Sequence, residues 1–420
     1  MLRKSKKHYD LLTDPLTTST KEDFTVDYDT FLLRPKVIMD THSFEYDKMM
    51  NMLNIVLKFI IENKLTIVGG MAINYSLIKT NKDKLYSDDE IPDYDIITDK
   101  PVEYAFALAN ILTKEFDFEN IDIIRALHPS TVRVRYYLIT LLDITYIAPD
   151  ILSEIPKLQI SPSLINKPTH EKYGDITFVH PWYQFMDIHY AMANPYENSP
   201  VETVNIRTYK DIHRYNKMYD QYPTIDKSDF NLYDIKFTED IIKIIESDFL
   251  WNGFIAYEIF TGKIDPDGPH INEIIKLPLP EIKILSIKNT NVKSDLVKSK
   301  LRLPKHHIFK IDDVSVSIEL INKTTLYCKR YPKCVHIQNL LMYFITEHLT
   351  RKNPIEKKIF LHYYEKTRQL LDKSFIDIDG IIKQDQKHIS DLSDPNVFPG
   401  NVNKFDTILE FDYSKFPWTD

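Results

Sequence analysis

The chain has 420 residues, of which 43% are hydrophobic and 27% charged, and its formal net charge at pH 7 is −8. This composition is typical of globular proteins with two or three domains and excludes a wholly disordered chain. The negative charge excludes a uniformly basic nucleic-acid coat, although a local basic groove remains compatible with it. Two cysteines are too few for a disulfide framework or a zinc quartet, which favours a reducing compartment. No apolar run approaches the ~20 residues of a membrane-spanning helix, so we expect none.

The first predicted unit is a helix, a strand, a glycine turn and a second helix. Apolar residues recur at helical spacing over residues 44–63, and residues 65–68 form a short apolar strand. Gly69-Gly70 then leads directly into a helix predicted over 71–78. The chain has only 8 glycines in 420 residues, so an adjacent pair indicates a backbone that needs them.

Strands alternate with helices in the next stretch. A polar loop over 80–92 precedes a strand predicted over 93–97, and Pro101 then opens a helix over 102–114. Further strands are predicted at 121–125, 131–136 and 141–146, and further helices at 180–193 and 201–219.

The second half of the chain contains a weak echo of the first. Residues 241–250 are predicted to form a helix, and the segment 251–257 that follows resembles residues 68–74. A later strand is predicted over 308–320, but no Asp-x-Asp motif follows the echo at strand spacing. A degenerate internal duplication and a chance similarity therefore both remain open.

Three acidic residues carry the strongest chemical signal. Asp93 and Asp95 lie two apart on a predicted strand, so both carboxylates project from the same face. Asp143 is an isolated acid in an otherwise apolar strand, and it would join them if the two strands are neighbours. Carboxylates held together repel each other unless a cation lies between them, and Mg²⁺ prefers such oxygen ligands. Three carboxylates would suffice for two metal ions that serve phosphoryl chemistry.

The glycine turn and two basic pairs complete the candidate site. At a strand-to-helix turn, Gly69-Gly70 would let backbone N–H groups and the helix N-terminus approach a phosphate. Lys210 and Arg214 lie four apart on a predicted helix and could neutralise outer phosphates. Arg133 and Arg135 share a strand face and could guide RNA or triphosphate, or form structural ion pairs. Each feature alone has an ordinary structural explanation, so the indication comes from their order and spacing.

That order resembles the nucleotidyltransferase superfamily of DNA polymerase β. The resemblance implies that Gly69 and Gly70 hold the nucleotide phosphates and that Asp93, Asp95 and Asp143 bind two metal ions. One departure is visible, because many members have Gly-Ser at the turn, with the serine contacting phosphate. Here the second residue is glycine, which leaves more of the contact to backbone amides.

Several stretches further resemble the poly(A) polymerase catalytic subunit of large nucleocytoplasmic DNA viruses, of the mimivirus, asfarvirus and poxvirus type. They are Gly69-Gly70-Met71-Ala72-Ile73, Pro92-Asp93-Tyr94-Asp95, Arg125-Ala126-Leu127-His128, Arg133-Val134-Arg135, Asp143-Ile144-Thr145-Tyr146, His180-Pro181 and Lys210-Asp211 with Arg214-Tyr215-Asn216. The likeness covers residues 65 to about 220 and weakens beyond them. It implies template-independent transfer of AMP from ATP to an RNA 3′ end, with Mg²⁺ or Mn²⁺ and release of pyrophosphate.

The resemblance also implies an architecture. We expect an α/β (α+β) protein whose nucleotidyltransferase fold has a mixed sheet and is followed by a degenerate nucleotidyltransferase-like domain. The predicted division is an N-terminal arm over 1–40, a catalytic domain over 41–220, the degenerate domain over 221–390 and a tail over 391–420.

The expected partners and location follow from the same resemblance. The chain is expected to bind RNA 3′ ends, to form a homodimer or use a viral cap methyltransferase-type processivity partner, and to have no membrane association. The expected location is the virion and the cytoplasmic viral factory of the infected cell. Two alternatives remain: a nucleotidyltransferase that adds one or a few nucleotides, and a catalytically inactive RNA-binding processivity subunit.

Overall fold

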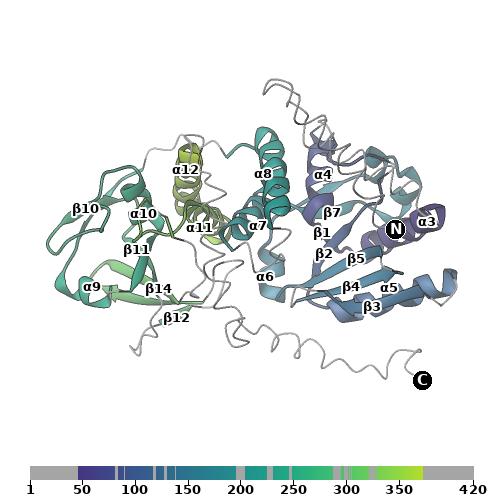
Figure 1. The fold of residues 1–420 in the computed structure, drawn as a ribbon, viewed down its shortest axis with the longest axis horizontal. Coiled ribbons are helices and arrows are strands. Elements are labelled where there is room, and N and C mark those ends of the chain that lie inside the picture. Colours follow the sequence, from purple (N-terminus) through teal and green to yellow (C-terminus); the bar gives the residue numbers. More distant parts are fainter. Residues whose placement is uncertain are drawn as a thin grey trace, which may run out of the picture.

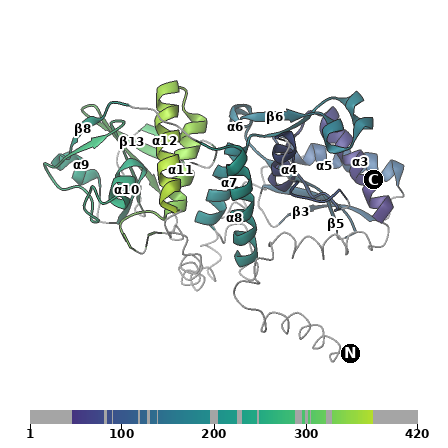
Figure 2. The same ribbon diagram turned by 90° about the horizontal axis from the view of Figure 1, so that it is seen from above.

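Two lobes lie side by side in the computed structural model, with a group of helices between them (Figure 1, Figure 2). The structure describes residues 46–371, with gaps at 81–83, 89, 117–119, 127–129, 138, 195–203, 225–229, 246–247, 287–294, 298–300, 302, 304, 321–326 and 329. The predicted arm over 1–40 and tail over 391–420 lie outside the described residues. No helix within the described ranges combines the length and apolarity needed to cross a bilayer.

The first lobe is built on a mixed sheet, as predicted. Its order among the described residues is β3-β4-β5-β2-β1-β7-β6. β1 is antiparallel to β2, whereas β1 with β7 and β2 with β5 are parallel pairs. Its strands are β1 Thr66–Val68, β2 Tyr94–Thr98, β3 Ile121–Arg125, β4 Thr131–Tyr136, β5 Ile139–Tyr146, β6 Lys157–Ile160 and β7 Ile176–Val179.

Helices cover this sheet and connect its strands. α5 packs along β3, β4 and β5, and α4 packs against β1, β2 and β7. The helices are α3 Tyr46–Glu62, α4 Gly69–Lys79, α5 Pro101–Glu115 and α6 Pro149–Glu154, with two 3-10 helices at Pro162–Ile165 and Pro168–Tyr173. The predicted helices and strands of this half are confirmed with small shifts at their ends. β6 and β7 are not predicted, because each is only 4 residues long and lies near proline-rich turns.

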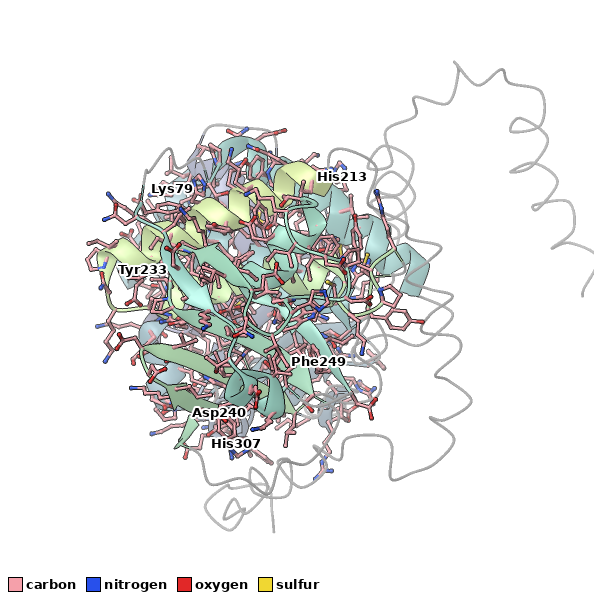
Figure 3. The ribbon with its side chains drawn as sticks, turned by 90° about the vertical axis from the view of Figure 1, so that its left-hand side faces the viewer. Lys79, His213, Tyr233, Asp240, Phe249 and His307 are labelled. Carbon is pink, nitrogen blue, oxygen red and sulfur yellow. The ribbon has the colours of Figure 1, made fainter. Side chains whose placement is uncertain are left out.

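The second lobe contains a smaller sheet with the order β12-β13-β14-β11-β9 and a separate pair, β10-β8. Figure 3 faces this lobe and labels Tyr233 on β8, Asp240 on α9, Phe249 on β9 and His307 on β13. The elements are β8 Tyr233–Lys236, α9 Glu239–Ile244, β9 Phe249–Asn252, α10 Gly253–Phe260, β10 Ile274–Leu277, β11 Glu281–Ser286, β12 Asp295–Val297, β13 His306–Ile311 and β14 Val314–Leu320.

The strand topology of the second lobe matches that of the first. β9 is antiparallel to β11, which is parallel to β14, and β14 is antiparallel to β13, repeating the β1, β2, β5 and β4 arrangement. α10 begins at Gly253 with φ of 61°, as α4 begins at Gly69 with φ of 66°. The second sheet therefore shares this strand arrangement with the first, whereas the internal duplication and the division into domains at residue 220/221 stay predictions.

Two predictions for the second lobe are wrong. The helix predicted over 241–250 ends at Ile244, and β9 begins at Phe249. The end of the helix coincides with the polar residues Glu246-Ser247-Asp248, which interrupt the apolar pattern before β9. The single strand predicted over 308–320 is a hairpin, because Asp312 adopts a positive φ of 52° in the turn between β13 and β14.

Four helices lie between the two sheets: α7 Pro181–Ala193, α8 Val204–Gln221, α11 Ile337–Thr350 and α12 Pro354–Leu371 (Figure 1, Figure 2). Buried polar contacts join them. His189 Nδ1 lies 2.7 Å from Gln338 Oε1, and His189 Nε2 lies 2.9 Å from the Tyr364 hydroxyl. The Tyr364 hydroxyl also lies 3.0 Å from that of Tyr215. Burial lowers the pKa of His189 to about 4, so the imidazole is neutral at pH 7.

Tyr364→Phe is expected to lower the free energy of unfolding by about 1–3 kcal/mol, because it leaves buried partners on His189 and Tyr215 without the shared hydroxyl. Urea unfolding measures the change. Tyr173→Phe, on a half-buried ring of the first lobe, is the control and should change stability by less than about 0.5 kcal/mol. Equal effects of the two variants would show that the shared hydroxyl does not stabilise this junction.

Candidate active site

The three predicted carboxylates converge at the centre of the first sheet. β2 and β5 are parallel neighbours, and their register places Asp95 beside Asp143. Asp93 lies immediately before β2. Tyr94 and Ile96 are buried in the core at 3% and 0% exposure, as their alternation predicts. The adjacency of the two strands, which the sequence could only assume, is what brings Asp143 to the other two.

The carboxylates of Asp93, Asp95 and Asp143 repel one another. The pKa of Asp95 is raised well above its usual value, first because the surrounding protein desolvates the carboxylate and then because Asp93 and Asp143 repel its charge. The pKa of Asp93 is also raised, by desolvation and then by Asp143. Positive charge from Arg214 and Lys210 opposes both shifts. The cluster thus concentrates negative charge that a cation would stabilise.

Asp143 has a protein counter-ion in this structure. Arg133 lies directly opposite it on β4, and its Nε and Nη2 donate to Oδ1 and Oδ2 of Asp143 at 2.7 and 2.6 Å. The bidentate pairing raises the pKa of Arg133. Arg135 pairs instead with Asp122 at 3.1 Å. Of the two interpretations of these arginines, the structure shows ion pairing.

The glycine turn lies against the carboxylates. β1 ends at Val68, which is paired with Asp95, and α4 starts at Gly69. A Cβ atom on Gly69 would lie 2.5 Å from Asp95 Oδ2, so only glycine fits there. No side chain caps the N-terminus of α4. Its first N–H groups and the helix dipole therefore favour an anion next to the carboxylate cluster.

The two predicted basic residues reach the same place from α8. The charges of Lys210 and Arg214 act on both Asp93 and Asp95. The pKa of Lys210 is lowered, chiefly by the neighbouring charge of Arg214. Arg214 Nη2 also donates to the hydroxyl of Tyr86. Positive side chains thus lie close to both the carboxylates and the glycine turn.

The part of the chain that carries the three carboxylates is similar to known proteins. Residues 54–198 match the family model described as Poly(A) polymerase catalytic subunit. Over these residues the chain is similar to that family. The African swine fever virus proteins of strain Badajoz 1971 Vero-adapted and of isolate Tick/Malawi/Lil 20-1/1983, each named "Putative poly(A) polymerase catalytic subunit", are both 35% identical over 171 residues. That match covers 41% of this chain and about a third (33%) of the relatives' length.

The fold extends the likeness over most of the chain. The crystal structure of the Megavirus polyadenylate synthase has a TM-score of 0.61 and 16% identity, covering 86% of this chain and 78% of that one. At this identity the match establishes the fold, a nucleotidyltransferase fold with mixed sheets, and not the activity. It includes the second lobe, which the family model does not reach.

Metal ions are implied by this family, and the donor set fits them in chemistry. Asp93 and Asp95 have raised pKa values, and Asp143 is paired with Arg133. All three carboxylates are oxygen ligands of the kind that Mg²⁺ and Mn²⁺ take. Their present arrangement is not a formed ligand set: no group of three or more His, Cys, Asp or Glu side chains in the described ranges could hold a metal ion as placed. Both oxygens of Asp143 are bound to Arg133, which accounts for the difference.

The second lobe presents different chemistry at the matching positions. Lys283 pairs with Asn252 just before Gly253, as Asp95 pairs with Val68 just before Gly69, and Ser317 pairs with Lys283 as Asp143 does with Asp95. Lys283 Nζ lies 3.3 Å from Glu319. The copy therefore has an ammonium group where the first lobe has a carboxylate, which agrees with its predicted degeneracy.

Sequence reasoning missed two residues of the first-lobe site. Tyr86 lies over the glycine turn, and Asn74 on α4 holds the loop that carries it, with Oδ1 accepting the N–H of Leu85 at 2.7 Å. Nothing in the spacing of the polar loop singles out Tyr86. The one available signal was a polar Asn74 at a buried position of a helix (6% exposed).

Proposed function

We propose that the chain is a polynucleotide adenylyltransferase that adds AMP from ATP to RNA 3′ ends without a template. The observation that carries the proposal is the position of Asp95. Its carboxylate lies against Gly69 of the phosphate-binding turn and beside Asp143 of the neighbouring strand. The proposal is also supported by the family of residues 54–198 and by the fold shared with a polyadenylate synthase.

The chain's own residues would position the triphosphate. The N–H groups at the start of α4 would bind its phosphates, and Lys210 and Arg214 would offset the negative charge of the departing pyrophosphate. Transfer joins the 3′ oxygen of the RNA to the α-phosphorus of ATP and breaks the bond from that phosphorus to the α,β-bridging oxygen, which leaves with pyrophosphate. The proton of the 3′ hydroxyl passes to solvent. Most of the rate enhancement would come from this positioning and from charge stabilisation.

Asp93, Asp95 and Asp143 would hold divalent metal ions. When bound, such ions lower the pKa of an attacking hydroxyl and neutralise charge on a triphosphate. We assign Asp93 and Asp95 to both ions and Asp143 to the one beside the 3′ hydroxyl. Arg133 would have to release Asp143 for this, and it stays near the cluster as a cation for the RNA backbone.

The partners and location are part of the proposal. We infer a homodimer or a cap methyltransferase-type processivity partner, and a place in the virion and the cytoplasmic viral factory. Sedimentation of the full chain with and without RNA would measure the first point. The viral source of the relatives supports the second.

Primer extension tests the function. Purified full-length chain is incubated with a labelled RNA oligonucleotide, Mg²⁺ or Mn²⁺, and each nucleoside triphosphate separately, beside an Asp93→Ala/Asp95→Ala control. A long ladder with ATP alone, absent in the control, is the expected result. One or two additions, or a preference for CTP or UTP, would point to the nucleotidyltransferase that adds few nucleotides. RNA binding without any extension would leave the inactive binding subunit.

A further inference from the structure

The Tyr86 hydroxyl occupies the space beside the second glycine of the turn. A Cβ atom built on Gly70 would lie 2.0 Å from that hydroxyl oxygen, little more than a C–O bond length. The same Cβ would lie 2.9 Å from Arg214 Nη2. The phenol oxygen therefore fills space that any side chain at position 70 would need.

Tyr86 is held in this place by several contacts. Asn74 Oδ1 accepts the backbone N–H groups of Leu85 and Tyr86 at 2.7 and 3.4 Å, and Leu85 is buried at 4% exposure. Arg214 donates to the Tyr86 hydroxyl, and its guanidinium lies 6.0 Å from the centre of the ring. The ring is thus anchored from its backbone and from its polar end.

The Tyr86 hydroxyl keeps its proton in these surroundings. Desolvation raises the pKa of Tyr86, with the charge of Arg214 opposing and those of Glu90, Asp93 and Asp95 adding to the rise. The phenol is therefore protonated at neutral pH. Its oxygen accepts from Arg214, so the phenol proton is left for an acceptor such as a phosphate oxygen.

We propose that the Tyr86 hydroxyl, together with Arg214, binds a phosphate group at the Gly69-Gly70 turn and supplies the hydroxyl contact that a side chain at position 70 cannot make. The ligand class is a polyphosphate, and its identity as the triphosphate of ATP rests on the proposed function. Tyr86 is accordingly a binding residue contributed from the loop rather than from the turn itself.

Binding of inorganic tripolyphosphate to the full chain, measured by calorimetry with and without Mg²⁺, tests this independently of polymerisation. Tyr86→Phe is expected to raise the dissociation constant about tenfold, the loss of one hydrogen bond to a charged group. Its thermal unfolding midpoint should stay near that of the wild type. Tyr137→Phe, on an exposed ring of the same lobe, is the control and should bind as the wild type does.

A relocated hydroxyl gives the sharper test. A leucine at position 86 removes the phenol from Gly70, so Gly70→Ser in that background requires only a small shift of the flexible end of Arg214, which lies 2.9 Å from the new Cβ. The double variant should bind tripolyphosphate more tightly than Tyr86→Leu alone. Gly70→Ser with Tyr86 present should lose binding, because the serine collides with the phenol.

The outcomes separate the two proposals. The role of Tyr86 would be overturned if Tyr86→Phe bound tripolyphosphate with wild-type affinity, or if the wild type did not bind it at all. It would also be overturned if the loss of affinity followed a loss of thermal stability and Gly70→Ser did not restore binding. Binding that depends on Tyr86 in a chain that extends no RNA would keep the phosphate contact and reject the polymerase.

Discussion

Asp95→Asn is expected to reduce AMP addition by about 10²–10³-fold or more while raising the thermal stability of the metal-free protein. The carboxylate is desolvated and repelled by Asp93 and Asp143, so its charge is unfavourable in the folded chain. An uncharged amide of nearly the same shape removes that repulsion. It also removes the charge on which the proposed chemistry depends. Primer extension and thermal unfolding measure the two effects on the same preparation.

The stability gain should depend on pH in a defined direction. Because the folded-state pKa of Asp95 is raised above its usual value of 3.8, the folded chain binds the proton more tightly than the unfolded chain. The wild type therefore loses stability, relative to Asp95→Asn, as pH rises from about 4 through the raised folded-state pKa. Below about pH 4 the two proteins should converge. Urea unfolding across this range gives the difference directly.

Asp122→Asn is the matched control. Asp122 lies on β3 of the same sheet, and its carboxylate is half-exposed and paired with Arg135 at 3.1 Å. Its replacement should change stability by at most about 1 kcal/mol and leave extension intact. Full activity in Asp95→Asn, or a stability that falls rather than rises, would contradict the proposed role of the cluster.

The first half of the fold could be predicted because each element there has its own local signal. α3 has apolar residues at helical spacing, and β2 and β5 are short, largely apolar strands that carry Asp95 and Asp143. The glycine pair stands out in a chain that avoids glycine. What the spacing could not give is which strands are neighbours, since pairing is decided by packing far along the chain. The family resemblance supplied that step.

The contacts that complete the site have no such signal. Arg133 faces Asp143 only because β4 and β5 pair in one particular register, and a shift by one residue would turn it to the other face. Tyr86 reaches Gly70 from an irregular loop. In the second lobe, the polar residues Glu246-Ser247-Asp248 lie between α9 and β9, and the prediction of a single helix over 241–250 passes over this break.

Gly69→Ala is expected to damage both stability and activity. Gly69 has a φ of 66°, which costs an alanine about 1–2 kcal/mol, and the new methyl group would lie 2.5 Å from Asp95 Oδ2. The turn or the carboxylate must move, so the free energy of unfolding should fall by more than the cost of the backbone conformation alone. Extension should fall about 10²-fold, because a displacement of this size disturbs the positioning of reacting groups.

Gly262→Ala separates backbone strain from the contact with Asp95. Gly262 has a similar φ of 75°, and a Cβ atom there would meet nothing within 4 Å. This control should lose only the 1–2 kcal/mol of backbone strain, to within about 0.5 kcal/mol, and keep full extension. The excess loss in Gly69→Ala then measures the clash at the turn. If the two variants lose equal stability and both extend RNA, close packing of Asp95 on the turn does not matter for catalysis. If only Gly69→Ala fails, glycine at position 69 is required by the carboxylate beside it.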